Sequence, residues 1–352
     1  MKEIKDITIG RHTIGAMHRP YVIAEMSGNH NQSLERALAI VDAAATAGVQ
    51  ALKLQTYTAD TITLDVEEGD FVIGDAASLW KGRSLHSLYK EAYTPWDWHA
   101  PIFKRCHDLG LDCFSTPFDE SAVDFLETLD VPVYKIASFE NIHHPLLKKV
   151  ASTGKPVIMS TGMASISELA ESVEILRRGG VKDLVLLKCT STYPATPENT
   201  NIMTIPHMQQ LFDCPVGLSD HTMGTGVSVA AVALGARVIE KHFTLKRADG
   251  GVDSAFSLEP EELRSLVVET ERAWHSLGAI TYGPTEKEKQ SLQWRRSLYV
   301  GKNMKAGEIF TPDNLRIVRP GLGLPPKFYE VVLGRAVKKD VKKGTPVSWE
   351  IV

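Results

Sequence analysis

The sequence predicts a (β/α)₈ barrel followed by a small β-rich domain, and two observations lead to this prediction. Between residues 21 and 277, short apolar runs alternate with helical patterns, and eight such βα units can be counted. The apolar runs are mostly continuous, which is typical of parallel strands that are covered on both faces. Eight units favour a closed barrel over a doubly wound sheet, and no Gly-x-Gly-x-x-Gly motif follows the first strand.

The expected strands and helices alternate in order along this stretch. The strand candidates are 21–26, 50–55, 111–116, 132–137, 156–160, 183–189, 215–219 and 237–243. Ser33 is suited to the N-cap of the first helix, and Gly48 to its end. Pro95 suits the first position of a later helix, and Ser165 with Glu168 forms a capping box for another.

Two segments interrupt the alternation. Residues 57–94 separate the second strand from the next helix, although βα connections usually have roughly 2–6 residues. A barrel places such an insertion over the face that carries its chemistry. After about residue 278, short strands with Gly, Pro and Lys turns replace the helical pattern. We therefore predict a barrel domain over 1–278, a linker over 279–291 and a β-rich domain over 292–352.

Composition and charge exclude several kinds of partner. Among 352 residues, 39 Lys and Arg face 43 Asp and Glu, and the resulting charge of −4 predicts no nucleic-acid partner. No signal-peptide pattern or membrane-length apolar run is visible, so we expect a cytoplasmic protein without a membrane partner. The four cysteines lack C-x-x-C spacing and are expected to be reduced and mostly buried.

Polar side chains gather where the predicted strands end, which is where barrel enzymes carry their chemistry. Lys53 and Lys135 stand within apolar strands, where a charged amine without an anionic partner is costly. Three interpretations stay open for these lysines. They could bind a phosphate or carboxylate ligand, form structural ion pairs with Glu25 or Glu140, or act through a Schiff base.

Two histidines end consecutive predicted strands. His221 and His242 could therefore direct both imidazoles at one divalent metal ion, leaving positions for water and substrate oxygens. Hydrogen bonding alone is the competing interpretation, because single histidines at strand ends commonly serve that purpose. Glu25 and Glu140 are candidates for acid–base chemistry, since burial at a barrel mouth raises carboxyl pKa values.

Taken together, the strand-end motifs resemble those of the sialic acid synthase family. They include AEMSGNHNQ (24–32), LKLQTYT (52–58), FSTPFDE (114–120), YKIASFE (134–140), MSTGMAS (159–165), KCTSTYPATP (188–197), GLSDHT (217–222), IEKHFT (239–244) and GGVDSAFSLEP (250–260). The segment NLRIVRPG near the carboxyl end resembles the antifreeze-like (SAF) domain that follows the barrel in this family. The resemblance implies an enzyme that condenses phosphoenolpyruvate with an N-acyl amino sugar to form a nine-carbon ulosonic acid.

The resemblance also implies a role for each matching residue. Glu25, Glu140, Lys53 and Lys135 would be catalytic, and His221 and His242 would hold Mn²⁺ or Mg²⁺. Phosphoenolpyruvate would contact Lys53, Gln55, Thr116, Lys135, Ser138, Ser160, Ser191, Tyr193 and Ser219, and the sugar would contact Phe118, Asp253 and Arg319. Arg319, in IVRPG, resembles the family arginine that the SAF domain of one subunit inserts into the barrel of the other, and this resemblance implies a domain-swapped homodimer. Ser191 departs from the asparagine that is usual in neuraminate synthases.

The choice of sugar depends on a few loop residues. Ser27-Gly28-Asn29-His30 and the segment 78–99 resemble the pseudaminic branch of the family, whose sugar is 2,4-diacetamido-2,4,6-trideoxy-altrose. N-acetylneuraminate or legionaminic acid synthesis is the alternative within the family. A Schiff-base aldolase without metal and a non-catalytic carbohydrate-binding protein are the alternatives outside it.

Overall fold

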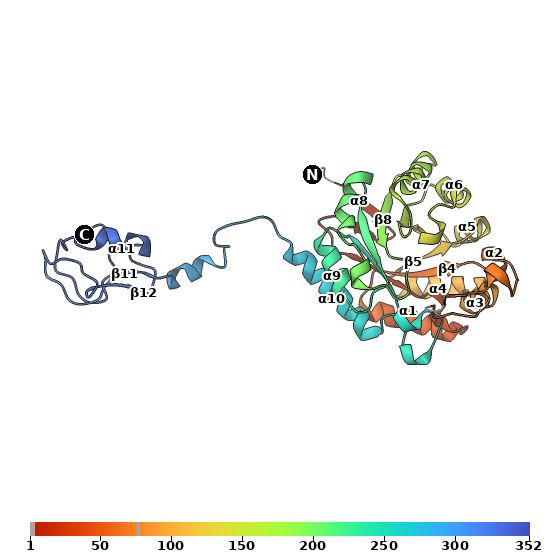
Figure 1. The fold of residues 1–352 in the computed structure, drawn as a ribbon, viewed down its shortest axis with the longest axis horizontal. Helices are drawn as coiled ribbons and strands as arrows, with labels where there is room; N and C mark the ends of the chain where they lie inside the picture. Colours follow the sequence, from red (N-terminus) through yellow and green to blue (C-terminus); the bar gives the residue numbers. More distant parts are fainter. Residues whose placement is uncertain (1–3, 76–77) are drawn as a thin grey trace. The chain divides into compact units, whose positions relative to one another are not determined.

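The computed structural model describes residues 4–75 and 78–352, which form two compact units, Met1–Gly278 and Ala279–Val352. In the first unit, eight parallel strands close into a barrel in the order β10-β3-β4-β5-β6-β7-β8-β9 (Figure 1). The strands are β3 Tyr21–Glu25, β4 Ala51–Thr56, β5 Asp112–Pro117, β6 Tyr134–Ile136, β7 Val157–Ser160, β8 Leu184–Cys189, β9 Val216–Asp220 and β10 Val238–His242. The predicted (β/α)₈ barrel is confirmed.

Helices surround the barrel and bury its outer face. They are α1 Leu34–Ala47, α4 Trp96–Asp108, α5 Glu120–Glu127, α6 His144–Ser152, α7 Ile166–Arg178, α8 Thr204–Phe212, α9 Gly226–Ala233 and α10 Pro260–Ser276. The predicted Ser33 cap of α1 and the capping box of α7 are both present. Helix α4 begins at Trp96 with Pro95 at the N-cap, one residue later than predicted, so Pro95 precedes the first helical position.

A short hairpin covers the amino ends of the barrel strands. It consists of β1 Ile7–Ile9 and β2 His12–Ile14. The carboxylate of Asp112 lies 2.8 Å from His12 Nδ1 and accepts a hydrogen bond from the Tyr21 hydroxyl at 2.9 Å. Asp112 and Tyr21 are the first residues of β5 and β3, so these contacts fix the hairpin at the amino ends. The polar strand ends singled out in the sequence lie at the opposite, carboxyl ends.

The insertion at 57–94 reaches across the carboxyl-end face, as expected. It contains α2 Ala59–Ile62 and α3 Leu85–Ala92. The indole of Trp80 donates a hydrogen bond to the carbonyl of Val252 at 3.0 Å, and its ring centre lies 6.2 Å from that of Tyr193. Val252 follows β10, two strands from β4, and Tyr193 follows β8 on the opposite side of the barrel, so the insertion reaches across the carboxyl-end face.

The second unit has a separate small core. Strands β11 Ser297–Val300 and β12 Leu315–Val318 pair in antiparallel fashion, and helix α11 spans Tyr329–Val332. Leu298, Phe310 and Val347 are buried within this unit. The four cysteines of the chain are free and buried. Within residues 4–75 and 78–352, no helix is long and apolar enough to cross a membrane.

Candidate active site

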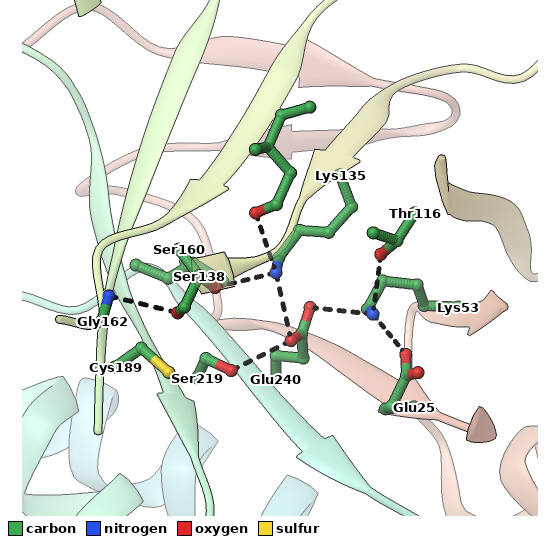
Figure 2. A network of polar contacts seen from close by, with 12 residues as sticks. Glu25, Lys53, Thr116, Lys135, Ser138, Ser160, Gly162, Cys189, Ser219 and Glu240 are labelled. Carbon is green, nitrogen blue, oxygen red and sulfur yellow. Dashed lines mark hydrogen bonds and ion pairs between the residues drawn. The ribbon is translucent and has the colours of Figure 1, made fainter. Parts of the chain in front are cut away.

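Two buried lysines from neighbouring parts of the barrel wall form the centre of the site (Figure 2). Lys53 lies on β4 and Lys135 on β6, and their side chains are 4% and 2% exposed. The Lys53 ammonium is 2.5 Å from the Glu25 carboxylate and donates to Thr116 Oγ1 at 3.1 Å. The Lys135 ammonium donates to Ser160 Oγ at 2.8 Å. Both cations are therefore held by residues that the sequence analysis assigned to the site.

Glu240 on β10 links the two lysines. Its carboxylate oxygens lie 3.4 Å from Lys135 Nζ and 3.9 Å from Lys53 Nζ, and it accepts a hydrogen bond from Ser219 Oγ at 3.0 Å. Of the ion pairs left open in the sequence analysis, the structure contains that of Lys53 with Glu25. Glu140, the other carboxylate considered as an ion partner for the lysines, pairs with neither of them among the described residues, where the ion partner of Lys135 is Glu240.

Burial and charge act against each other in this network. Burial raises the pKa of Glu25 to about 7, although the neighbouring Lys53 ammonium opposes the rise. Burial lowers the pKa of Lys53, but Glu240 and Glu25 outweigh burial and raise it overall. Burial dominates at Lys135 and lowers its pKa, with Glu240 only partly compensating. The positive charge of Lys135 is therefore less well balanced by neighbouring carboxylates than that of Lys53. An arriving anion would stabilise the Lys135 ammonium more than the Lys53 ammonium.

A group of small polar residues extends the site beyond Lys135. The backbone N–H of Gly162 donates to Ser138 Oγ at 3.1 Å. A Cβ added at Gly162 would collide with the hydroxyls of Ser191 and Ser138, so this glycine lets three strand-end segments approach closely. The Asn141 amide donates to the carbonyls of Ser160 and Gly162 at 3.2 and 3.1 Å and holds the turn in place. Hydroxyl donors next to a lysine suit a phosphate group.

The two predicted metal ligands face each other. The ring centres of His221 and His242 are 5.3 Å apart. His221 Nδ1 lies 2.9 Å from the Thr190 carbonyl, and a proton donated there leaves Nε2 free to bind a cation. His242 Nδ1 is buried without a hydrogen-bond partner in the described part of the chain and lies 3.7 Å from the Asp253 carboxylate.

These residues fit a divalent metal site at which the protein would fill only some of the coordination positions. No group of three or more His, Cys, Asp or Glu among the described residues could by itself hold a metal. Burial and the neighbouring His221 hold the pKa of His242 well below its usual range, so its imidazole is in the neutral form that binds metals. Two imidazoles would leave positions for oxygen ligands from substrate and water. Asp253, which accepts a hydrogen bond from Ser27, borders the same space.

Three other predicted residues lie around this centre. Gln55 donates hydrogen bonds to Glu25 at 2.9 Å and to Ser27 at 3.1 Å. The Tyr193 ring packs on His221, with centres 4.6 Å apart. Phe118 packs on Tyr57, with ring centres 5.0 Å apart. Tyr193 therefore borders the histidine side of the site, and Gln55 and Ser27 join Glu25 to the Asp253 side.

Glu140 differs from the other buried carboxylates. One oxygen of each of Glu140, Glu25 and Glu240 is buried without a hydrogen-bond partner among the described residues, but those of Glu25 and Glu240 form ion pairs with Lys53, whereas Glu140 forms none there. Burial raises the pKa of Glu140 to about 7, opposed by the nearby charge of Lys135. Glu25, by contrast, is bound by Lys53 and Gln55. Glu140 is thus the carboxylate with a free oxygen and a pKa suited to moving a proton near neutral pH.

The sequence interpretation assigned no role to two central residues, Glu240 and Gly162. Side chains alternate along a strand, so an inward-facing His242 predicts that Glu240, two residues earlier, also faces inward. That signal was present in IEKHFT. Gly162 gave only a weak signal, because nothing in the local sequence shows that Ser138 and Ser191 approach its Cα.

Comparison with known proteins places the chain in a family. The NeuB family profile matches residues 40–282, and the SAF domain profile matches residues 295–352. The chain belongs to the NeuB family. The resemblance to sialic acid synthases drawn from the strand-end motifs is thereby confirmed, together with the SAF domain.

Individual NeuB relatives cover nearly the whole chain. Pseudaminic acid synthase of Campylobacter jejuni serotype O:2 is 44% identical over 92% of this chain and 94% of its own length. The enzyme of the same name from Helicobacter pylori is 40% identical over 94% of this chain and 96% of its own. A solved N-acetylneuraminic acid synthetase from Leptospira borgpetersenii, in complex with citrate, has a TM-score of 0.73 and 32% identity. It covers 82% of this chain and 95% of that one.

Proposed function

We propose that the chain condenses phosphoenolpyruvate with 2,4-diacetamido-2,4,6-trideoxy-β-L-altropyranose and water, giving pseudaminic acid and phosphate. The observation that carries this proposal is the pair of buried lysines, Lys53 and Lys135, surrounded by hydroxyl donors at the carboxyl end of the barrel. Phosphoenolpyruvate carries a carboxylate and a phosphate, and two separate cations match that pattern. The two relatives named pseudaminic acid synthase support the choice of sugar.

The proposed contacts with phosphoenolpyruvate follow from this arrangement. Lys53 and Lys135 neutralise the two anionic groups, and Glu240 holds both ammonium groups in place before the substrate arrives. The remaining contacts come from Gln55, Thr116, Ser138, Ser160, Ser191, Tyr193 and Ser219, to which we add the backbone of Gly162. Asp253 and Phe118 are assigned to the sugar.

In the proposed reaction, C3 of phosphoenolpyruvate attacks the aldehyde carbon of the open-chain sugar, and the aldehyde oxygen gains a proton. Water adds at C2 and gives up a proton, and the resulting tetrahedral centre releases phosphate by cleavage of its C–O bond. When bound at His221 and His242, a divalent metal, Mn²⁺ or Mg²⁺, supplies polarisation of the aldehyde. We assign the removal of the water proton to Glu140, because its buried oxygen is unpaired.

The pH profile tests the assignment of Glu140. A base acts in its ionised form, so kcat/KM is expected to fall about tenfold per pH unit below the pKa of about 7. Glu140→Gln is expected to lower kcat/KM by about 10²-fold or more and to remove this acid limb. Glu25→Gln is the matched control, and it should retain the limb. Loss of the limb in Glu25→Gln and its persistence in Glu140→Gln would transfer the role to Glu25.

Adding one methyl group at Gly162 tests the placement of the phosphate. In Gly162→Ala the new Cβ would occupy the space between the Ser138 and Ser191 hydroxyls, so the KM for phosphoenolpyruvate should rise by about tenfold or more, roughly 1.4 kcal/mol. The control is Gly226→Ala, where an added Cβ meets no atom within 4 Å. Steady-state kinetics with each substrate varied would show this. A rise confined to the sugar KM would contradict the assignment.

We further propose a homodimer in which Arg319 of one subunit reaches the sugar in the barrel of the other. Arg319 is exposed at the end of β12, which leaves its guanidinium available for such a contact. Arg319→Ala should raise the sugar KM by about tenfold and leave the melting temperature almost unchanged. Arg316→Ala, an exposed arginine on the same strand, is the control. A larger effect on melting temperature than on KM would contradict the proposal.

Mixing the Arg319→Ala variant with the inactive His242→Ala variant tests whether the contact crosses between subunits. A mixed dimer of Arg319→Ala and His242→Ala chains would contain one complete site, because the His242→Ala chain supplies Arg319 to the intact barrel. Mixing should therefore create sites with the wild-type sugar KM, so that activity at low sugar concentration rises above that of either variant alone. No regain after subunit exchange, verified by mass spectrometry, would place Arg319 in its own subunit.

The deciding experiment is release of phosphate from phosphoenolpyruvate with each of two sugars. Release with 2,4-diacetamido-2,4,6-trideoxy-altrose, its absence with N-acetylmannosamine and its loss in EDTA are expected. With ¹⁸O in the bridging position, the label should appear in phosphate, as C–O cleavage requires. Release only with N-acetylmannosamine would keep the chemistry and change the sugar. Label retained in the sugar product would contradict the mechanism.

A further inference from the structure

A fully buried ion pair lies directly behind the two histidines. The Lys241 ammonium is 2.9 Å from the Asp220 carboxylate, and the two side chains are 1% and 0% exposed. Asp220 and Lys241 are paired across the ladder between β9 and β10. Each immediately precedes one of the histidines, His221 or His242. The proposed reaction uses neither of these charged groups.

Both charged groups of the ion pair make further hydrogen bonds. Asp220 Oδ1 accepts from the backbone N–H of Thr222 at 2.9 Å and from its hydroxyl at 2.7 Å. Asp220 Oδ2 accepts from Ser228 Oγ at 2.7 Å, in addition to Lys241. The Lys241 ammonium also donates to the Thr222 carbonyl. These bonds join the end of β9, the end of β10 and helix α9 into one rigid unit.

Alternation along the strands explains how this unit acts on the site. Consecutive residues of a strand point to opposite faces. Asp220 contacts Ser228 of α9, outside the barrel wall, whereas the ring of His221 contacts Tyr193 and that of His242 contacts Phe256 on the site side. Fixing the outward pair therefore also fixes the two backbone positions from which the imidazoles project inward.

A buried ion pair is a poor way to gain stability, because the loss of hydration offsets most of the attraction. Packed apolar residues of similar volume would serve as well. An ion pair held by five hydrogen bonds adds defined geometry, which allows little variation in the separation of the strand ends. Two imidazoles can share one cation only at a defined separation.

We propose that Asp220 and Lys241 are positioning residues that set the separation of His221 and His242 for binding of one divalent cation. This inference rests on the metal site of the proposed function. It predicts that breaking the pair weakens metal binding far more than the binding of phosphoenolpyruvate, because the two cations for phosphoenolpyruvate, Lys53 and Lys135, lie on other strands, although Ser219 and Glu240 lie on β9 and β10.

The test is direct measurement of Mn²⁺ binding by electron paramagnetic resonance, with the full chain and without turnover. Asp220→Asn and the double variant Asp220→Asn with Lys241→Met should each weaken Mn²⁺ binding by at least tenfold. Nitrogen couplings to Mn²⁺ should fall from two histidines to one. Phosphoenolpyruvate affinity, measured by calorimetry, should stay within twofold. The control, Lys149→Met, cuts an exposed ion pair with Asp124 and should change neither affinity.

The possible outcomes distinguish a failure of the positioning role from a failure of the metal assignment. The double variant contains no buried charge at this position, so it provides the measurement if Asp220→Asn alone does not fold. Wild-type affinity for Mn²⁺ in a folded double variant would overturn the positioning role and leave the proposed function standing. Failure of the wild-type chain to bind Mn²⁺ would overturn the metal assignment and the positioning role together. Equal loss of Mn²⁺ and phosphoenolpyruvate binding would show a general disturbance and overturn the positioning role alone.

Discussion

Replacement of His242 by alanine is expected to abolish turnover while leaving the fold intact. The imidazole is one of only two proposed metal ligands, and its Nδ1 makes no hydrogen bond among the described residues that the fold would lose. Its removal leaves one histidine, which is too few to hold a divalent ion at micromolar concentrations. Activity at saturating Mn²⁺, circular dichroism and the melting temperature should be measured on the same preparation.

The control for this variant is His143→Ala. His143 also follows a barrel strand, but its side chain is exposed and outside the network of buried charges. It should retain nearly full activity. If His242→Ala works at close to the wild-type rate in buffer with excess Mn²⁺, the metal assignment is wrong, whatever the effect of EDTA on the wild-type chain.

Replacement of Lys135 by methionine is expected to lower kcat/KM for phosphoenolpyruvate by about 10³-fold, the size of effect seen when a preorganised charge-stabilising donor is removed. Methionine keeps most of the volume and removes the cation. Glu240 keeps Lys53 as an ion partner at 3.9 Å, so the loss of stability should be limited. Steady-state kinetics and thermal unfolding would show both effects.

Lys155→Met is the matched control, because its partially exposed ammonium pairs with Glu127 and Asp130 away from the strand ends. A fall of less than tenfold in Lys135→Met would contradict its role in binding the substrate anion. Borohydride trapping with pyruvate separates the aldolase alternative from the condensation. Covalent labelling of Lys53 or Lys135 would establish a Schiff base and overturn the proposed chemistry.

The barrel could be predicted because each of its strands carries its own signal. Continuous apolar runs such as residues 184–187 have to be buried on both faces, and turn residues limit each run. The ends of strands were also predictable, because Lys53, His221 and His242 are polar residues at the end of apolar segments. The position of these residues at strand ends therefore predicted that they lie on the carboxyl-end face of the barrel.

Pairings within the site were less predictable. Glu140 belongs to the turn Ser138–Glu140 after β6, where side-chain direction depends on the backbone path rather than on strand alternation. The sequence analysis considered only Glu25 and Glu140 as ion partners of the lysines, whereas the partner of Lys135 is Glu240, which is distant in sequence. Closure of the barrel makes β10 and β6 face each other across its interior, and no local pattern contains that information.

The hairpin of β1 and β2 affects the order in which substrates bind and products leave. With Asp112 holding it over the amino ends of the strands, and with side chains filling the barrel interior, reactants can pass only by the carboxyl-end face. Both substrates and both products share this single route. The substrate that binds first is enclosed by the substrate that binds second. The first substrate therefore cannot leave until the second has left. Phosphoenolpyruvate held by the buried lysines should therefore be trapped once the sugar is bound, and an isotope-trapping experiment would show its commitment to product.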